Sequence, residues 1–145
     1  MMNWGLLGAG LVMGVSTIGS GIGLWIVGQA AVGAWKKCYA ANKPAPMLLL
    51  VLCGMPMSQT FYGFILMLQM RPAAFANPEN GLLYLGIGAA AGISNLITAV
   101  SQGKISASAA DAQAETGKGF AQYLMVIGIA ESVALFTMVF SMIAL

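Results

Sequence analysis

The sequence predicts an all-α membrane protein with four transmembrane helices, built as two repeated hairpins. Of its 145 residues, 59% are hydrophobic and only 7% are charged, whereas a soluble domain carries about 25% charged residues. So few charges cannot cover a water-soluble surface, and the mean hydropathy of +0.86 agrees. The chain holds four apolar segments of membrane-spanning length, and the first and third of them share a glycine pattern.

These four segments define one membrane domain over residues 1–145, because a lipid-spanning helix needs about 20 apolar residues. We expect the helices at about 3–38, 46–70, 79–112 and 119–145. The joints carry helix breakers, namely Asn42-Lys43-Pro44 with Pro46, Arg71-Pro72 through Asn77-Pro78, and Glu115-Thr116-Gly117. The segments are long and lack strand-like alternation, so helices are favoured over a membrane barrel.

The basic residues predict the orientation of these helices. Arg71 lies at the second joint, whereas we place the lysines at or near the first and third joints: Lys36, Lys37, Lys43, Lys104 and Lys118. The positive-inside rule then puts the first and third joints in the cytoplasm and both termini outside, in a multi-pass protein of the cell membrane.

An internal repeat relates the two halves of the chain. The glycine pattern from Gly8 to Ser16 matches the pattern from Gly86 to Ser94 at an offset of 78 residues. The second and fourth helices align less clearly, at an offset of 74. The halves are therefore predicted to be two helical hairpins in parallel orientation, at about 1–72 and 79–145.

Small residues are frequent in the first and third helices, whereas bulky residues mark the second and fourth. Three pairs have the small-xxx-small spacing that lets helices approach closely in lipid: Gly10/Gly14, Gly19/Gly23 and Gly88/Gly92. The bulky residues of the even helices suit a lipid-facing wall: Phe61, Phe64, Leu66, Phe136 and Phe140. This division predicts a homo-oligomeric ring with helices 1 and 3 inside and helices 2 and 4 outside.

The composition also excludes several function classes. The sequence has no His, which removes the usual proton shuttle and the commonest transition-metal ligand. The net charge of +2 is too small and too scattered for a nucleic-acid partner. Cys38 and Cys53 lie in apolar helical sequence and are interpreted as small core residues rather than a disulfide framework.

Glu131 is the candidate functional residue. It lies near the middle of the fourth predicted helix, whereas the other three acids lie near joints: Glu79, Asp111 and Glu115. An acid at the bilayer centre costs about 2.5–3.5 kcal/mol on insertion scales, so it is a functional-site hypothesis by default. The alternative is a structural acid that is hydrogen-bonded to a neighbouring helix.

Polar side chains on two other helices are predicted to reach the same depth as Glu131. On the second helix, Met55 and three polar residues share one face: Ser58, Gln59 and Tyr62. At a rise of about 1.5 Å per residue from the cytoplasmic joints, Gln59, Gln102 and Glu131 all lie about 18–21 Å deep. We therefore expect one joint site, in which Tyr62 donates its hydroxyl to Glu131.

The predicted site offers a carboxylate, two amide oxygens and a hydroxyl, a set that suits a small monovalent hard cation. Ca²⁺ normally takes about six to eight oxygens, and Zn²⁺ or copper is disfavoured without His or converging thiolates. A proton needs only the acid and one hydrogen-bond partner, so the additional ligands favour Na⁺ over H⁺, which stays the alternative. Pro56 frees the carbonyl of Leu52 most directly, so spacing alone identifies no carbonyl ligand.

These residues resemble a known family, the rotor-ring proteolipid of V-type ATPases (the c-subunit, called K in bacterial Na⁺-translocating forms). The resemblance covers essentially the whole chain and is carried by four segments: Ser20-Gly21-Ile22-Gly23, Pro56 to Phe64, Ser101-Gln102-Gly103-Lys104 and Ala130-Glu131-Ser132. Where the Na⁺ members have leucine-proline-glycine-threonine-glutamine and then tyrosine-glycine, this chain reads Met55-Pro56-Met57-Ser58-Gln59 and then Tyr62-Gly63. Ser58 keeps the hydroxyl of the threonine, and Met57 is bulkier than the glycine it replaces.

The resemblance implies one Na⁺ site with a defined ligand set. The ligands are the Glu131 carboxylate, the amide oxygens of Gln59 and Gln102, the Ser58 hydroxyl and the Met55 backbone carbonyl, with Tyr62 hydrogen-bonded to Glu131. At the repeat offsets, Met57 matches Glu131 and Leu24 matches Gln102. The first half therefore lacks the ligands, which gives one ion site per four helices, as in this family.

The implied function is that of a rotor subunit, which carries Na⁺ across the membrane as a lipid-embedded ring turns. The implied partners are a stator membrane subunit with a basic residue and the central-stalk subunits of the ATPase. The chain itself is expected to be non-catalytic, because it has no ATP site and ATP hydrolysis resides in other subunits. The alternatives are the same rotor carrying H⁺, a small multidrug exporter, and a structural tetraspan scaffold.

Overall fold

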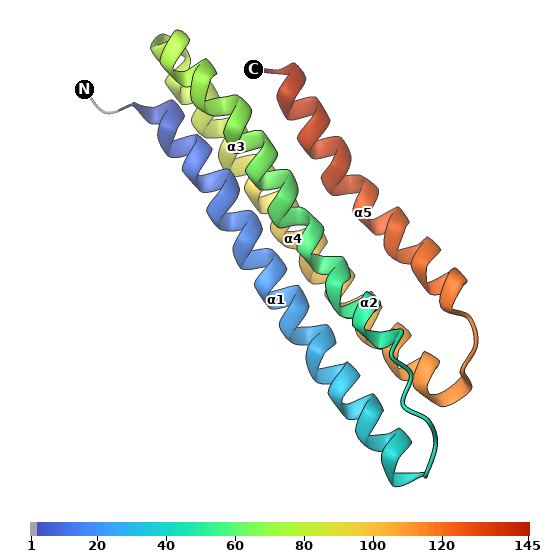
Figure 1. Cartoon of the computed structure of the whole chain (residues 1–145). Coiled ribbons are helices and arrows are strands. Elements are labelled where there is room, and N and C mark those ends of the chain that lie inside the picture. The colour runs from blue at the N-terminus through green and yellow to red at the C-terminus, as the bar shows by residue number, and fades with distance from the viewer. Residues whose placement is uncertain (1–2) are drawn as a thin grey trace.

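The computed structural model describes residues 3–145 as four long helical segments that lie side by side (Figure 1). The segments are built from α1 (Trp4–Ala40), α2 (Leu49–Gly54), the 3₁₀ turn η1 (Met55–Met57), α3 (Ser58–Ala76), the 3₁₀ turn η2 (Pro78–Asn80), α4 (Gly81–Thr116) and α5 (Phe120–Ile143). Four segments are long and apolar enough to cross a membrane, with α2, η1 and α3 together forming the second. The fold is therefore that of an all-α, multi-pass membrane protein.

Both hairpin turns lie at one end of the bundle, and the chain termini lie at the other (Figure 1). Between α4 and α5 the turn is very short, and Gly117 and Gly119 adopt φ angles of 66° and 87° there. Glycine takes this left-handed conformation without a steric penalty, so it ends α4 sharply. At the longer turn, the indole N–H of Trp35 donates to the carbonyl of Pro46 at 2.9 Å and ties the loop to α1.

Two predicted boundaries are wrong in detail. The second span continues past Met70 and through Pro72 to Ala76, although the proline lacks the N–H that would bond the Leu68 carbonyl. The third span ends at Thr116 rather than at 112. Lys104, which we placed near the third joint, lies well inside α4, and its side chain is exposed.

The closest helix pair is α1 and α4, which run in parallel. Their backbones meet at glycines: a Cβ added at Gly88 would overlap the backbone of Gly8, and one added at Gly103 would lie 2.5 Å from the Cα of Gly23. Small residues therefore bring these helices together, as the sequence predicted. A Cβ at Gly10 or at Gly14 meets nothing within 4 Å in this chain, so neither glycine packs against another of its helices, and close approach of this pair to other copies stays a prediction.

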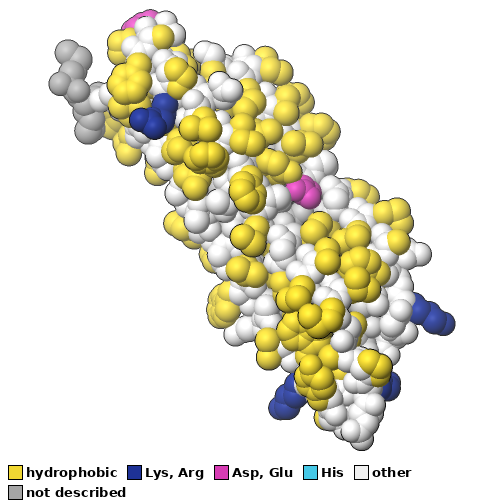
Figure 2. All heavy atoms as spheres, viewed as in Figure 1, with side chains coloured by type: hydrophobic (Ala, Val, Ile, Leu, Met, Phe, Trp, Pro, Cys, Tyr) yellow, Lys and Arg dark blue, Asp and Glu magenta, His cyan; other side chains and the backbone are white. Residues whose placement is uncertain are grey.

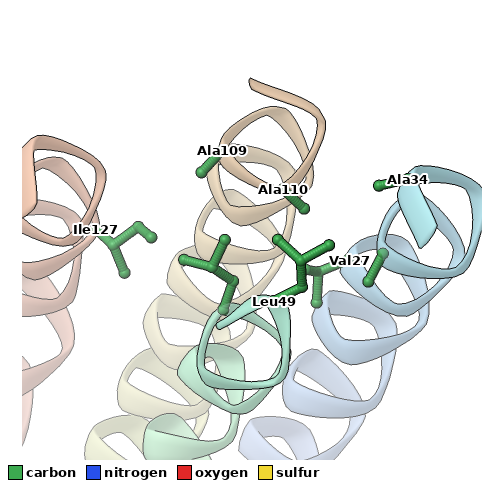
Figure 3. Close-up of a cluster of buried hydrophobic side chains, with 8 residues drawn as sticks. Val27, Ala34, Leu49, Ala109, Ala110 and Ile127 are labelled. Carbon is green, nitrogen blue, oxygen red and sulfur yellow. The ribbon is translucent and has the colours of Figure 1, made fainter. Parts of the chain in front are cut away.

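Hydrophobic side chains form two clusters, one toward each end of the bundle. Figure 3 shows the cluster near the hairpin turns, where Val27, Leu49, Ala110 and Ile127 come together from different helices. Cys38 is buried and Cys53 packs against this cluster. The second cluster, toward the termini, includes Val12, Leu66, Met70 and Tyr84. Between the two clusters many of the buried side chains are polar: Ser16, Ser20, Gln59, Asn95, Thr98, Gln102 and Ser106.

Large apolar residues cover much of the outer surface, with Lys and Arg near its two ends (Figure 2). The exposed aromatic residues include four that were predicted to face lipid: Phe61, Phe64, Phe136 and Phe140. Leu66, which we also placed on that wall, is fully buried. It follows Gln59 and Gly63 on the inward stripe of α3, where an i, i+4, i+7 spacing keeps all three on one face.

Candidate ion-binding site

A break in the second span sets the positions of Ser58 and Gln59. Pro56 has no N–H to donate, and the Leu52 carbonyl instead accepts the N–H of Met55. The chain tightens into the 3₁₀ turn η1 and resumes as α3 at Ser58. Both the N–H and the hydroxyl of Ser58 donate to the carbonyl of Met55, the latter at 3.1 Å. The two predicted ligand groups of this turn therefore lie together, bonded to each other.

Two buried amides form a hydrogen-bonded chain across three helices. The Nε2 of Gln59 donates to the Oε1 of Gln102 at 2.9 Å, and the Nε2 of Gln102 donates to the backbone carbonyl of Ile127 at 3.3 Å. Both glutamine side chains are fully buried. This chain orients the two side chains and leaves the Oε1 of Gln59 buried without a hydrogen-bond partner. An unpaired buried acceptor costs about 1–3 kcal/mol.

The carboxylate of Glu131 faces α3. Its Oε1 accepts the hydroxyl of Tyr62 at 2.7 Å, as the sequence led us to expect, and the pair is partly buried. Ile127, whose carbonyl holds Gln102, lies four residues before Glu131 on the same helix. One helical turn therefore separates the amide chain from the carboxylate, which agrees with the common depth estimated from the sequence.

The structure thus groups the predicted residues in three bonded sets: Met55 with Ser58, Gln59 with Gln102, and Tyr62 with Glu131. Within residues 3–145 no hydrogen bond joins the carboxylate directly to either amide. The site lies between the halves of the chain, because α3 belongs to the first hairpin while α4 and α5 form the second. Sequence reasoning missed the carbonyl of Ile127, for which the one-turn spacing from Glu131 was the available signal.

The arrangement offers two kinds of oxygen to a ligand. It combines one carboxylate with the unpartnered oxygen of Gln59, and no Lys or Arg is bonded to either group in the described part of the chain. Residues 3–145 also contain no group of three or more His, Cys, Asp and Glu side chains able to hold a metal ion. The set of oxygens suits a hard cation of low charge.

A known protein family matches the sequence of both hairpins. The family model for the ATP synthase C-subunit matches the chain twice, over residues 7–70 and 85–144. The first range covers most of α1 to α3, and the second covers most of α4 and α5. The chain therefore belongs to the ATP synthase C-subunit family, with one family unit in each hairpin.

A curated relative supports this assignment. The chloroplastic ATP synthase c-subunit of Phaeodactylum tricornutum (strain CCAP 1055/1) is 41% identical to this chain over 76 residues. The match spans 52% of this chain and 88% of the relative, so nearly the whole relative corresponds to about half of this protein. The c-subunits form oligomeric rings in ATP synthases and partner the other ATPase subunits, so this protein is a membrane rotor subunit of that family.

Proposed function

We propose that this rotor subunit belongs to a Na⁺-translocating V-type ATPase and carries Na⁺ between α3, α4 and α5. The V-type assignment is supported by the two family matches within one chain together with a single mid-membrane carboxylate. The first hairpin has Met57 at the position equivalent to Glu131, so a ring of such chains holds one ion site for every four helices.

The observation that carries the Na⁺ assignment is the buried, unpartnered Oε1 of Gln59. A proton on Glu131 satisfies the carboxylate alone and leaves this amide oxygen without a partner. A Na⁺ ion between the two satisfies both, and Gln102 and Ser58 supply further oxygens. The Met55 carbonyl becomes a ligand once the Ser58 hydroxyl turns away, because Ser58 donates two hydrogen bonds to it in this structure.

Electrostatics links the bound ion to rotation. A bare Glu131 carboxylate is unstable against lipid, whereas a Na⁺-neutralised one can pass through the apolar region. A stator subunit with a basic residue and half-channels then releases and reloads the ion. Moving one charge against 100 mV costs about 2.3 kcal/mol, which ATP hydrolysis supplies through central-stalk subunits. The lysine-rich hairpin turns face the cytoplasm of the cell, and the termini face outward.

H⁺ is the second candidate for the transported ion. The hydroxyl of Tyr62 provides the single hydrogen-bond partner that a protonated or ionised Glu131 needs. The same rotor mechanism then applies with a proton on Glu131. The family matches over both hairpins give the drug-exporter alternative no support.

Carbodiimide labelling of the purified ring separates the two ions. A carbodiimide modifies a protonated, accessible carboxyl group, so Na⁺ bound at Glu131 should block the reaction. We expect labelling of Glu131 to fall as NaCl is raised at constant ionic strength, with choline chloride as the matched control. Labelling that depends on pH but is unchanged by Na⁺ would assign the rotor to H⁺.

A further inference from the structure

Helix α1 contributes no proposed ligand to the site, yet at Gly23 it touches two of the elements that do, η1 and α4. A Cβ added at Gly23 would meet the Cβ of Pro56 at 2.7 Å and would overlap the backbone carbonyl of Ala99 on α4. Pro56 is fully buried at this contact. Gly23 is therefore packed against the break in the second span and against α4 at the same time.

On the α4 side, Gly103 also packs directly against the backbone of Gly23. A Cβ added at Gly103 would lie 2.5 Å from both the Cα and the carbonyl oxygen of Gly23. These neighbours are backbone atoms, which cannot rotate away as a flexible side chain can. The helices can accept a larger residue here only by moving apart or sliding past each other.

The two residues that Gly23 shares this junction with, Pro56 and Gly103, adjoin predicted ligands along the chain. Gly103 directly follows Gln102, and Pro56 lies between the Met55 carbonyl and the Ser58 hydroxyl in sequence. The separation of α1 from α4 and from η1 therefore fixes how α3 and α4 face each other. That separation sets the distance between the Gln59 and Gln102 amides, which are now 2.9 Å apart.

We infer that Gly23 is a positioning residue for the ion site. Because Gly23 has no side chain, α1 can pack closely against both η1 and α4, and this spacing places the oxygens of Gln59, Gln102 and Ser58 around one ion. The inference rests on the proposed Na⁺ site for its ligand. It differs from a packing role alone in predicting a change in ion affinity and ion selectivity, because both depend on the distances between these oxygens.

The test compares Gly23→Ala with Gly21→Ala in purified rings. Gly21 is on the same helix, and a Cβ there meets nothing within 4 Å in this chain. Size-exclusion chromatography first establishes that each ring assembles. We expect the Na⁺ concentration that half-protects Glu131 from carbodiimide to rise about tenfold or more in Gly23→Ala, and to stay near the wild-type value in Gly21→Ala.

Ion selectivity separates positioning from general destabilisation. A wider spacing of the proposed oxygen ligands changes the ratio of the Li⁺ and Na⁺ concentrations that half-protect Glu131, whereas partial unfolding leaves that ratio unchanged. Equal half-protecting concentrations and ratios in Gly23→Ala and wild type would overturn the inference. If Gly23→Ala does not assemble, Pro56→Gly is compared with Pro56→Ala. Both variants restore the backbone N–H, and only the glycine removes the Cβ that faces Gly23, so equal Na⁺ responses of the two variants refute the role.

Measuring Na⁺ protection of Glu131 in the wild-type ring separates a failure of the positioning role from a failure of the proposed function. Absence of Na⁺ protection in wild type would refute the Na⁺ assignment alone. The positioning role is then read from the rate at which carbodiimide labels Glu131 at one fixed pH, since the same spacing sets the access of the reagent to the carboxyl group. A changed rate in Gly23→Ala but not in Gly21→Ala supports the role, and equal rates refute it.

Discussion

The two hairpins share a repeated sequence pattern but not their chemistry. In the first, the hydroxyl of Ser58 donates to the Met55 carbonyl three residues earlier. In the second, the hydroxyl of Ser132 donates to the Ile129 carbonyl at the same spacing, 2.7 Å away. Both pairs are related by the offset of 74 residues found in the sequence. The repeat therefore extends to individual side-chain hydrogen bonds, beyond the glycine pattern.

The hairpins differ where an ion is expected to bind. Met57 and Leu24, the counterparts of Glu131 and Gln102, are exposed on the surface at 46% and 39%. Neither can ligate a cation. The comparison teaches that the duplicated scaffold fixes where a site can form, while a few side chains decide whether it does. The charge lies on α5, which has fewer buried residues than α1 or α4.

The largest expected effect comes from removing the charge that distinguishes the second hairpin. Glu131→Gln should abolish ion transport in reconstituted vesicles while the ring still assembles, because the amide has nearly the same shape but cannot neutralise a cation. Glu115→Gln, at the exposed end of α4, is the matched control and should transport normally. Transport by the Glu131→Gln ring would refute the assignment of the ion-carrying group.

A smaller effect is expected from the amide that the first hairpin contributes. Gln59→Leu keeps a buried side chain of similar size but removes the unpartnered oxygen, and it should raise the Na⁺ concentration for half-protection of Glu131 about 10–100-fold. Gln69→Leu alters an exposed glutamine of the same helix and should leave that concentration unchanged. Equal responses of the two variants would exclude Gln59 as a ligand.

The smallest effect tests the equivalent serines directly. Ser58→Ala should raise the half-protecting Na⁺ concentration about fivefold, corresponding to the loss of roughly 1 kcal/mol of interaction. Ser132→Ala removes the equivalent hydrogen bond from the hairpin whose serine is not a proposed ligand, and should leave Na⁺ protection unchanged. A similar loss in both variants would assign the effect to helix geometry rather than to ion binding.

Much of the fold follows from one-dimensional patterns. The lengths of the apolar segments predicted four spans, and the repeat predicted two hairpins; the family matches in both halves agree with it. The end of the second span was missed because Pro72 ordinarily marks a helix end, yet α3 tolerates it in its last turns. The distance along the chain also predicted that Gln59, Gln102 and Glu131 share a level, because helical rise is nearly constant.

The sequence alone determined that this protein enters a membrane and that one acid lies deep within it, since hydrophobicity and segment length act locally along the chain. Only the tertiary structure decided which side of each helix meets which neighbour. It buried Leu66, left Gly10 and Gly14 open, and brought the Ile127 carbonyl to Gln102. The physical reason is that helix rotation and spacing depend on contacts between residues far apart in sequence, here above all the glycine contacts of α1 with α4.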